Sequence, residues 1–285
     1  MTYSIINSWH MKKSAGFTLI ELSVVLVIIG LLVGGILVGR DLIRSSEIRG
    51  QISQIEEMVT AINTFKIKYG YMPGDMPPNQ SVQLGLFTFT GAQAGKTCSF
   101  FEFGNNDGGV NIVNEAYAFW SHLADANLVK GSYGGKAGNL LRAAAANCLA
   151  MTAGQPTSVP TTEAGYDLYL PRPKMPVKGH ILASENHNNG NLLFNNTTKA
   201  NALFIIPMVG TSDIYSANQA YQIDSNMDDG MPATGNVREK GTFPASTGVP
   251  ADNAPCTSSG VSPIKYDLSS ATADVANCTG LGFLF

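Results

Sequence analysis

An uncharged run near the amino terminus constrains this chain more than any other feature. From Leu22 to Gly39 no residue is charged, and most positions hold Leu, Ile or Val. The run is close to the about 20 residues that an α-helix needs to cross a bilayer. We therefore expect a single membrane-spanning helix, with the rest of the chain outside the hydrocarbon layer.

A carboxylate stands directly before this run. Glu21 precedes Leu22 without any intervening polar residue. A carboxylate near the centre of a bilayer costs about 2.5–3.5 kcal/mol, so such a group is rare there without a partner and usually serves a function. Glu21 is therefore a candidate functional residue, and its expected partner is a cation.

An ordinary secretory signal peptide is the alternative interpretation, with Lys12 and Lys13 as its positive region. Such a signal has an apolar core of ~7–15 residues and then a cleavage site with small residues. Here the run is longer, and Gly34-Gly35 is followed by Ile36-Leu37-Val38. This pattern disfavours an ordinary signal peptide.

The residues around Glu21 match a known pattern. Gly16-Phe17-Thr18-Leu19-Ile20-Glu21 resembles the processing site of type IV prepilins and of type II secretion pseudopilins. The resemblance implies that prepilin peptidase cuts between Gly16 and Phe17 and methylates the new amino terminus. It also implies that Glu21 pairs with the α-ammonium of Phe17 in a neighbouring subunit. Two charges that are costly alone would then compensate each other on assembly.

Three regions follow from these features. We expect a leader peptide over 1–16, a transmembrane and spine helix over 17–70, and a head domain over 71–285. Gly70 and Pro73 mark the expected end of the helix. Beyond the apolar run, hydrophobic residues recur at spacings of three and four, which places them on one helical face. They are Ile48, Ile52, Ile55, Val59, Ile62, Phe65 and Tyr69.

The sequence predicts an α+β head, with an antiparallel sheet laid against the long helix. Short runs with strand composition alternate with Gly, Asn and Pro, as in a meander. The expected strands are 84–90, 166–170, 177–184, 191–194 and 202–209, and the expected helices are 113–129 and 217–228. The stretch 71–78 is proline-rich and is interpreted as a linker. On the first of these helices, we expect Trp120 in the core and His122 on the surface.

An acidic stretch in the head is a candidate calcium site. Asp224, Asn226, Asp228 and Asp229 precede Gly230 with a spacing close to that of a calcium loop, although the glycine comes one position late. The secretion pseudopilins that this chain resembles often bind calcium in the head, and the resemblance makes these four residues the expected ligands. The alternative is a solvated helix end.

Four cysteines all follow the apolar run, without the close pairs of a zinc or redox site. An even number of cysteines in an exported head favours disulfides. The tail that contains Cys256 and Cys278 resembles the disulfide-bounded region of many type IV pilins, which implies that these two pair. Cys98 and Cys148 would then pair with each other or stay free. Four cysteines allow three pairings, so the connectivity stays open.

The net charge of the chain limits the classes of partner that it can bind. The chain has 18 Lys and Arg against 21 Asp and Glu, a net charge of −3, and no stretch is basic enough to indicate direct nucleic-acid binding. The resemblance implies as partners the prepilin peptidase, other pilin or pseudopilin subunits, and an inner-membrane assembly platform with its ATPase. It also implies a single-pass inner-membrane protein with its head in the periplasm, which enters a filament on assembly.

Taken with the resemblance, these residues predict a structural subunit of a type IV pilus or a type II secretion pseudopilus. The head is larger than in most major subunits, which favours a minor or specialised one. We expect no enzymatic activity, since the sequence contains neither Gly-x-Ser-x-Gly nor His-Glu-x-x-His. The alternatives are a filament-tip adhesin, a DNA-binding or surface-binding pilin, and a membrane-anchored hydrolase.

Overall fold

The computed structural model describes residues 16, 18–86, 92–93, 96–97, 104–110, 115–133, 166–167, 169–185, 200–207, 214–239, 256–257, 265–268, 276–278 and 280–285. The chain divides into two compact units, Met1–Ser46 and Glu47–Phe285.

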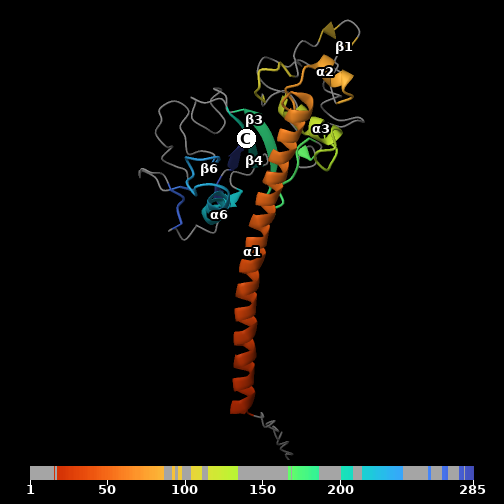
Figure 1. Ribbon diagram of the computed structural model, residues 1–285. Helices are drawn as coiled ribbons and strands as arrows, with labels where there is room; N and C mark the ends of the chain where they lie inside the picture. The colour runs from red at the N-terminus through yellow and green to blue at the C-terminus, as the bar shows by residue number, and fades with distance from the viewer. Residues whose placement is uncertain are drawn as a thin grey trace, which may run out of the picture. The chain divides into compact units, whose positions relative to one another are not determined.

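One long helix, α1, runs from Leu19 to Tyr69 and comprises 51 residues (Figure 1). It contains both the uncharged run and the periodic apolar face. The helix ends at Gly70, which adopts a φ of 76° and donates its N–H to the carbonyl of Lys66. A left-handed glycine after the last turn is a common helix stop, as the sequence predicts here.

Within the second unit, α1 buries one face. Ile48, Ile55, Ile62 and Phe65 are buried, as their spacing predicts. The other predicted residues of this face are partly buried; they are Ile52, Val59 and Tyr69. Met58, Ala61 and Gln51 are also buried. This part of α1 is therefore an integral element of the head's core.

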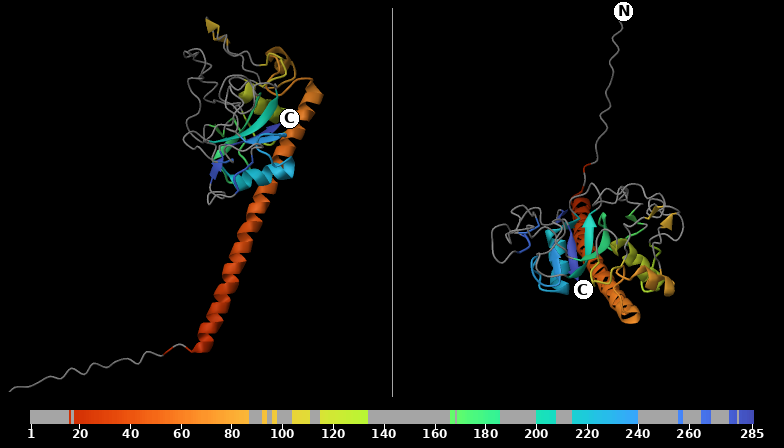
Figure 2. Two further views of the ribbon diagram at one scale, coloured as in Figure 1. Left: turned by 90° about the vertical axis from the view of Figure 1, so that its left-hand side faces the viewer. Right: turned by 90° about the horizontal axis from the view of Figure 1, so that it is seen from above.

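The head is α+β and contains a four-stranded antiparallel sheet. Its strands are β3 (Gly179–Glu185), β4 (Asn201–Pro207), β6 (Val237–Glu239) and β8 (Leu281–Leu284), in the order β3-β4-β8-β6. They lie side by side in both views of Figure 2. β3 and β4 match two of the predicted strands.

Shorter elements complete the described head. They are α2 (Pro78–Gln83), β1 (Ala92–Gln93), β2 (Lys96–Thr97), α3 (Glu115–Asp125), β5 (Tyr215–Ser216), α6 (Ala217–Met227) and β7 (Ala276–Cys278). α3 and α6 lie within the two helices that the sequence predicts for the head.

The sheet is not a simple meander. The carboxyl-terminal strand β8 lies between β4 and β6, where Phe283 pairs with Leu203 on one side and with Val237 on the other. Leu281 and Phe283 are both buried. The apolar strand β8 thus lies inside the sheet, where its side chains are buried in the core.

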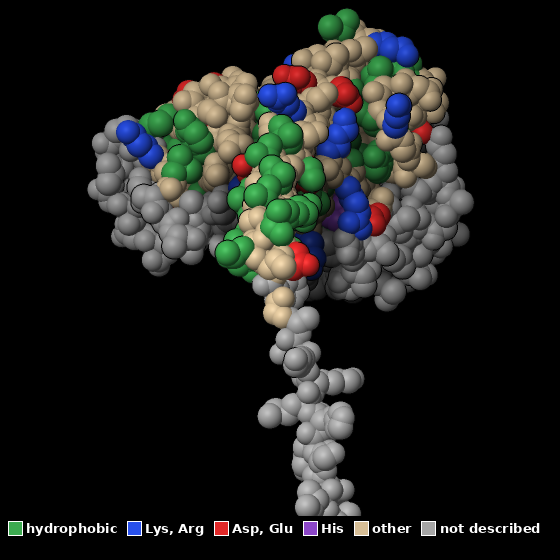
Figure 3. Space-filling model, turned by 90° about the horizontal axis from the view of Figure 1, so that it is seen from below, with side chains coloured by type: hydrophobic (Ala, Val, Ile, Leu, Met, Phe, Trp, Pro, Cys, Tyr) green, Lys and Arg blue, Asp and Glu red, His purple; other side chains and the backbone are tan. Residues whose placement is uncertain are grey.

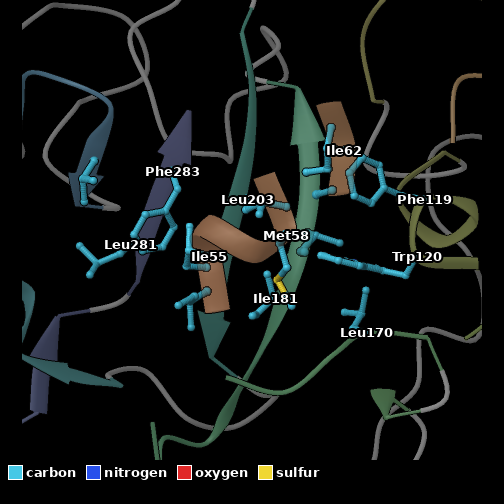
Figure 4. Packing of buried hydrophobic residues seen from close by; sticks show 14 of the residues in the cluster. Ile55, Met58, Ile62, Phe119, Trp120, Leu170, Ile181, Leu203, Leu281 and Phe283 are labelled. Atoms are coloured by element: carbon cyan, nitrogen blue, oxygen red, sulfur yellow. The ribbon is translucent and has the colours of Figure 1, made fainter. Parts of the chain in front are cut away.

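Side chains from α1, from the sheet and from α3 meet in one core (Figure 4). The residues labelled there are Ile55, Met58, Ile62, Phe119, Trp120, Leu170, Ile181, Leu203, Leu281 and Phe283. Full burial of a large apolar side chain contributes about 1.5–3 kcal/mol. Trp120 is fully buried, which confirms its predicted place in the core.

One predicted strand is wrong, and another is wrong over the part that the structure describes. The strand expected over 84–90 begins as a turn, because Leu84 N–H donates to the carbonyl of Gln80 and Leu86 N–H to that of Ser81 as α2 ends. Residues 87–90 lie outside the described residues. The strand expected over 166–170 is a tight turn as well. There Tyr169 and Leu170 both donate their N–H groups to the carbonyl of Tyr166. The strand expected over 191–194 lies outside the described residues.

His122 is buried, contrary to the prediction that it lies on the surface. Its side chain is 2% exposed, and its Nδ1 accepts the N–H of Gly74 at 3.0 Å. Its ring stacks on that of Phe65, with 5.9 Å between the ring centroids. The imidazole therefore joins α3 to both α1 and the stretch that follows α1.

That proline-rich stretch is packed into the head, although its composition predicts a linker. Met72, Asp75 and Met76 are buried. The Asp75 carboxylate accepts the N–H of Asn106 at 2.6 Å and that of Gly108 at 2.8 Å. Burial raises the pKa of Asp75 despite these two hydrogen bonds. The stretch is thus held to the loop 104–110 by a buried carboxylate.

Candidate functional site

The first unit exposes the apolar part of α1. The large hydrophobic side chains from Leu19 to Ile43 are between 48% and 88% exposed. Within the described part of the chain, α1 is the one helix long and apolar enough to cross a membrane, and none of its apolar window is buried. These side chains therefore require an apolar environment from outside the chain.

Thr18 and Glu21 form a capping box at the start of α1. Thr18 N–H and Thr18 Oγ1 both donate to Glu21 Oε2, at 2.8 and 2.7 Å. In return, Glu21 N–H donates to Thr18 Oγ1 at 3.3 Å. The pattern satisfies backbone donors that a helix end leaves without partners. Glu21 thus has a local structural role in the single chain, besides the predicted pairing between subunits.

The role of Thr18 is not among the features predicted from the sequence. A Thr followed three residues later by Glu, before an apolar run, is the sequence signature of a capping box. Thr18-Leu19-Ile20-Glu21 carries that signature. The signal was present, but the carboxylate was interpreted only through its predicted partner in a neighbouring subunit.

The predicted cleavage site is described only on its amino side. A Cβ placed at Gly16 would meet no described atom within 4 Å. The fold therefore leaves room for a larger residue at this position, and the need for glycine is expected to come from the peptidase. Phe17 and residues 1–15 lie outside the described residues.

The glycines of the apolar run are open as well. A Cβ at Gly30, Gly34, Gly35 or Gly39 would also meet no described atom within 4 Å. Small residues spaced four apart let two helices approach closely in an apolar environment. These positions are accordingly suited to contact with another helix.

The second candidate site lies at the end of α6. One carboxylate oxygen each from Asp224, Asp228 and Asp229 lie within 4.8 Å of one another. Asp224 is fully buried. Its Oδ1 accepts the N–H of Gly230 at 3.1 Å, and its Oδ2 accepts the hydroxyl of Tyr266 at 2.9 Å. The structure therefore brings together three of the four predicted calcium ligands.

The other two carboxylates fold the loop after α6. Asp228 accepts the N–H groups of Asn236 and Val237. Gly235 is required here, because it adopts a φ of 70° and a Cβ would overlap the Asp228 carboxylate. Asp229 similarly accepts backbone and hydroxyl donors within the loop. The loop is thus organised around its acids.

Electrostatics at this cluster fit a cation. The pKa of Asp224 is raised to about 7, chiefly by burial; the charges of Asp229 and Asp228 contribute to the rise, and hydrogen bonds from Tyr266 and Gly230 oppose it. A divalent cation would offset this repulsion, and carboxylate oxygens are the ligands that calcium prefers. Calcium binding stays a prediction.

Asn226 lies apart from this geometry. Its Nδ2 donates to the carbonyl of Gln222, one helical turn earlier, at 2.6 Å, and its side chain is exposed. Because its side chain binds the backbone of α6, Asn226 is a suitable control position for substitutions of the three aspartates.

A disulfide joins Cys256 to Cys278, whose Cα atoms are 4.8 Å apart. Both cysteines are fully buried. Cys278 ends β7, where it pairs with Tyr215 of β5 directly before α6. The bond therefore ties the tail to the start of the helix that carries the acidic cluster. Cys98 and Cys148 lie outside the described residues.

The first site lies in a segment that matches a known protein family. Residues 11–37 match the family described as the prokaryotic N-terminal methylation motif. The chain carries the type IV pilin and pseudopilin signature. The match covers Gly16, Glu21 and most of the exposed apolar run. No curated protein and no solved structure matches the chain.

The signature implies processing by prepilin peptidase and assembly with other pilin subunits. It fits a pilin-like subunit anchored in the inner membrane, and the proteins that share it are structural. The match ends at residue 37, before the head begins.

Proposed function

We propose that this chain is a minor or specialised subunit of a type IV pilus or a type II secretion pseudopilus. Prepilin peptidase would cut between Gly16 and Phe17 and methylate the new amino terminus. The first half of α1 would hold the subunit in the inner membrane and then in the filament core. The head would lie in the periplasm before assembly and on the filament surface afterwards.

The exposed apolar half of α1 carries this proposal. A helix whose large hydrophobic side chains are exposed all around finds its environment in lipid or among other helices. The signature over 11–37 supports both environments for this helix, the membrane before assembly and the filament after it. The assembly platform and its ATPase are the expected machinery for that transfer.

We propose no catalytic role for the head. Two of its buried polar side chains hold loops together: Asp75 binds two backbone N–H groups and His122 binds one. The head is large, and the second half of α1 is part of its core. We propose that a head of this size provides a specialised surface for contacts on the filament.

Electron microscopy of filaments tests the proposal. The host would express a tagged copy from its own locus, and filaments would be sheared, purified and labelled through the tag. We expect label on filaments, at few sites per filament for a minor subunit. A Gly16→Leu copy, which the peptidase should leave uncut, serves as the matched control and should stay in the inner membrane. A tagged wild-type copy absent from every filament fraction would contradict the proposal.

A further inference from the structure

His122 connects three parts of the head at the point where the chain leaves α1. Its Nδ1 accepts the N–H of Gly74 at 3.0 Å, which ties α3 to the stretch 71–76. Its ring lies parallel to that of Phe65 on α1, with 3° between the ring planes. The imidazole is buried, so both contacts are made away from solvent.

The backbone around this contact is confined. Gly74 adopts a φ of 83°, and a Cβ there would overlap the carbonyl oxygen of Glu115 at the start of α3. Gly104 adopts a φ of 64°, and a Cβ there would overlap the backbone of Met76. A buried N–H normally has an acceptor, and losing that acceptor costs stability. The N–H of Gly74 therefore depends on His122.

Only the neutral imidazole can make this contact. Nδ1 accepts a hydrogen bond only while it carries no proton, whereas an imidazolium is a donor at both ring nitrogens. Protonation of His122 would set Nδ1–H against the N–H of Gly74. The ordinary pKa of a histidine is about 6.5, so this type of side chain changes charge in mild acid. The contact between α3 and the stretch 71–76 thus depends on one proton.

The charged surroundings of His122 are of both signs. Asp75 is the nearest in sequence to Gly74, and its carboxylate already accepts the N–H groups of Asn106 and Gly108. Figure 3 shows basic and acidic side chains interspersed on the underside of the head, so that face supplies no field of a single sign. The other titratable groups on the elements packed around His122 are Glu115 and Asp125 on α3, Lys66, Lys68 and Tyr69 on α1, and His180 and Glu185 on β3.

We propose that the bond between Gly74 and His122 is an acid-sensitive lock, which opens when His122 takes up a proton. Opening would release the stretch 71–76 from α3, at the connection between α1 and the rest of the head. The apolar face of α1 that includes Ile55 and Ile62 would stay packed, because it does not depend on this bond. The inference concerns the head alone and does not rest on the proposed role in a filament.

The second buried imidazole of the described head has the opposite kind of partner. His180 Nε2 lies 2.9 Å from a carboxylate oxygen of Asp167, which also binds the guanidinium of Arg172. A carboxylate accepts a hydrogen bond from an imidazolium as well as from a neutral imidazole. This contact therefore survives protonation, which makes His180 the matched control for His122.

Hydrogen exchange at the Gly74 amide tests the lock in the full-length chain, held in detergent without calcium. An opened lock leaves His122 free to bind a proton as an ordinary histidine does, so the open fraction should rise about 25-fold from pH 7 to pH 5. We expect the protection factor of this amide, corrected for the intrinsic exchange rate, to fall by that factor. Asp75 and Asp224 have raised pKa values, so their protonation favours the folded head in acid. A loss of protection in acid therefore cannot come from either carboxylate.

Two substitutions assign the effect to one residue. His122→Asn keeps an acceptor near the position of Nδ1 but cannot titrate, so protection at Gly74 should change by less than about threefold between the two pH values. His180→Asn should retain the loss of protection seen in wild type. Equal protection of the wild-type amide at pH 7 and pH 5 would overturn the inference, even if His122→Asn failed to fold. A loss in His122→Asn as large as in wild type would overturn it too.

Discussion

The two halves of α1 differ in what they pack against, although both are rich in apolar residues. Before residue 47, the large hydrophobic side chains are exposed around the helix. After it, the apolar residues lie on one face, and Ile55, Ile62 and Phe65 are fully buried in the head. A continuous run needs an apolar environment all around, whereas a periodic one needs only a single packed face. The pattern of apolar residues therefore decides where each half finds its partner.

Truncating one large side chain in each half of α1 should change the stability of the head in one case and not in the other. Phe65→Ala removes a fully buried ring from the core, so it should lower the free energy of unfolding of the head by about 3–5 kcal/mol. Leu31→Ala, in the exposed half, should leave that free energy unchanged. Urea titration of the full chain in detergent, followed by tryptophan fluorescence, measures both. Equal losses from the two variants would contradict the division of α1.

The sequence predicts the difference between the two halves of α1, because apolar residues spaced by three and four indicate one helical face and an unbroken apolar run does not. The secondary structure of the head is harder to predict. The segment expected to be a strand over 166–170 is a turn, because the backbone N–H groups of Tyr169 and Leu170 bind the carbonyl of Tyr166 instead of a neighbouring strand. Short apolar runs do not distinguish these two possibilities.

The burial of individual polar side chains could not be predicted from the sequence either. His122 and Asp75 are buried because segments distant in the chain supply their partners, Gly74 for the first and Asn106 and Gly108 for the second. Such long-range hydrogen bonds leave no local pattern. The aspartates at the end of α6 were predictable because they are close in sequence, whereas Tyr266, which binds Asp224 from 42 positions away, was not.

The disulfide should stabilise only the head. Replacing Cys256 and Cys278 by Ser together opens a loop whose ends are 22 positions apart, which should lower the free energy of unfolding by roughly 3 kcal/mol in the chain-entropy model. Insertion of the apolar half of α1 into the membrane should not change. Thermal unfolding and membrane fractionation of the same variant measure the two effects, and loss of membrane insertion would count against the independence of the halves.

Stability of the head should depend on the protonation of Asp224. Its pKa is about 7 in the folded head and near 3.9 in an unfolded chain, so the folded state binds more protons between these values. Without calcium, the free energy of unfolding should therefore fall as the pH rises from about 4 to about 7, by on the order of 2 kcal/mol. Asp224→Asn should remove this part of the slope. An unchanged slope in urea titrations across that range would show that Asp224 is ionised throughout.

Calcium should reverse this loss if the three aspartates converge on the ion. A ligand that binds only the folded state raises its stability by about 2.7 kcal/mol at 100 times the Kd. The melting temperature at pH 7 should rise with calcium and fall again with a chelator. Asp228→Ala should abolish the shift, whereas Asn226→Ala should preserve it, because that side chain follows its own helix. Identical melting with calcium and with chelator would remove the site.

Glu21 is the residue of the exposed half of α1 that we predict to direct assembly. Glu21→Ala removes both the cap on Thr18 and the predicted pairing with the Phe17 ammonium of a neighbour. Thr18→Ala removes the hydroxyl part of the cap alone, worth about 0.5–2 kcal/mol, and leaves the carboxylate in place.

The decisive measurement is the amount of each variant in sheared filaments at equal membrane levels. We predict that Glu21→Ala is inserted and cleaved normally but incorporated at least tenfold less than wild type, and that Thr18→Ala is incorporated almost as well as wild type. Equal incorporation of Glu21→Ala and wild type would contradict the claim that this carboxylate directs assembly.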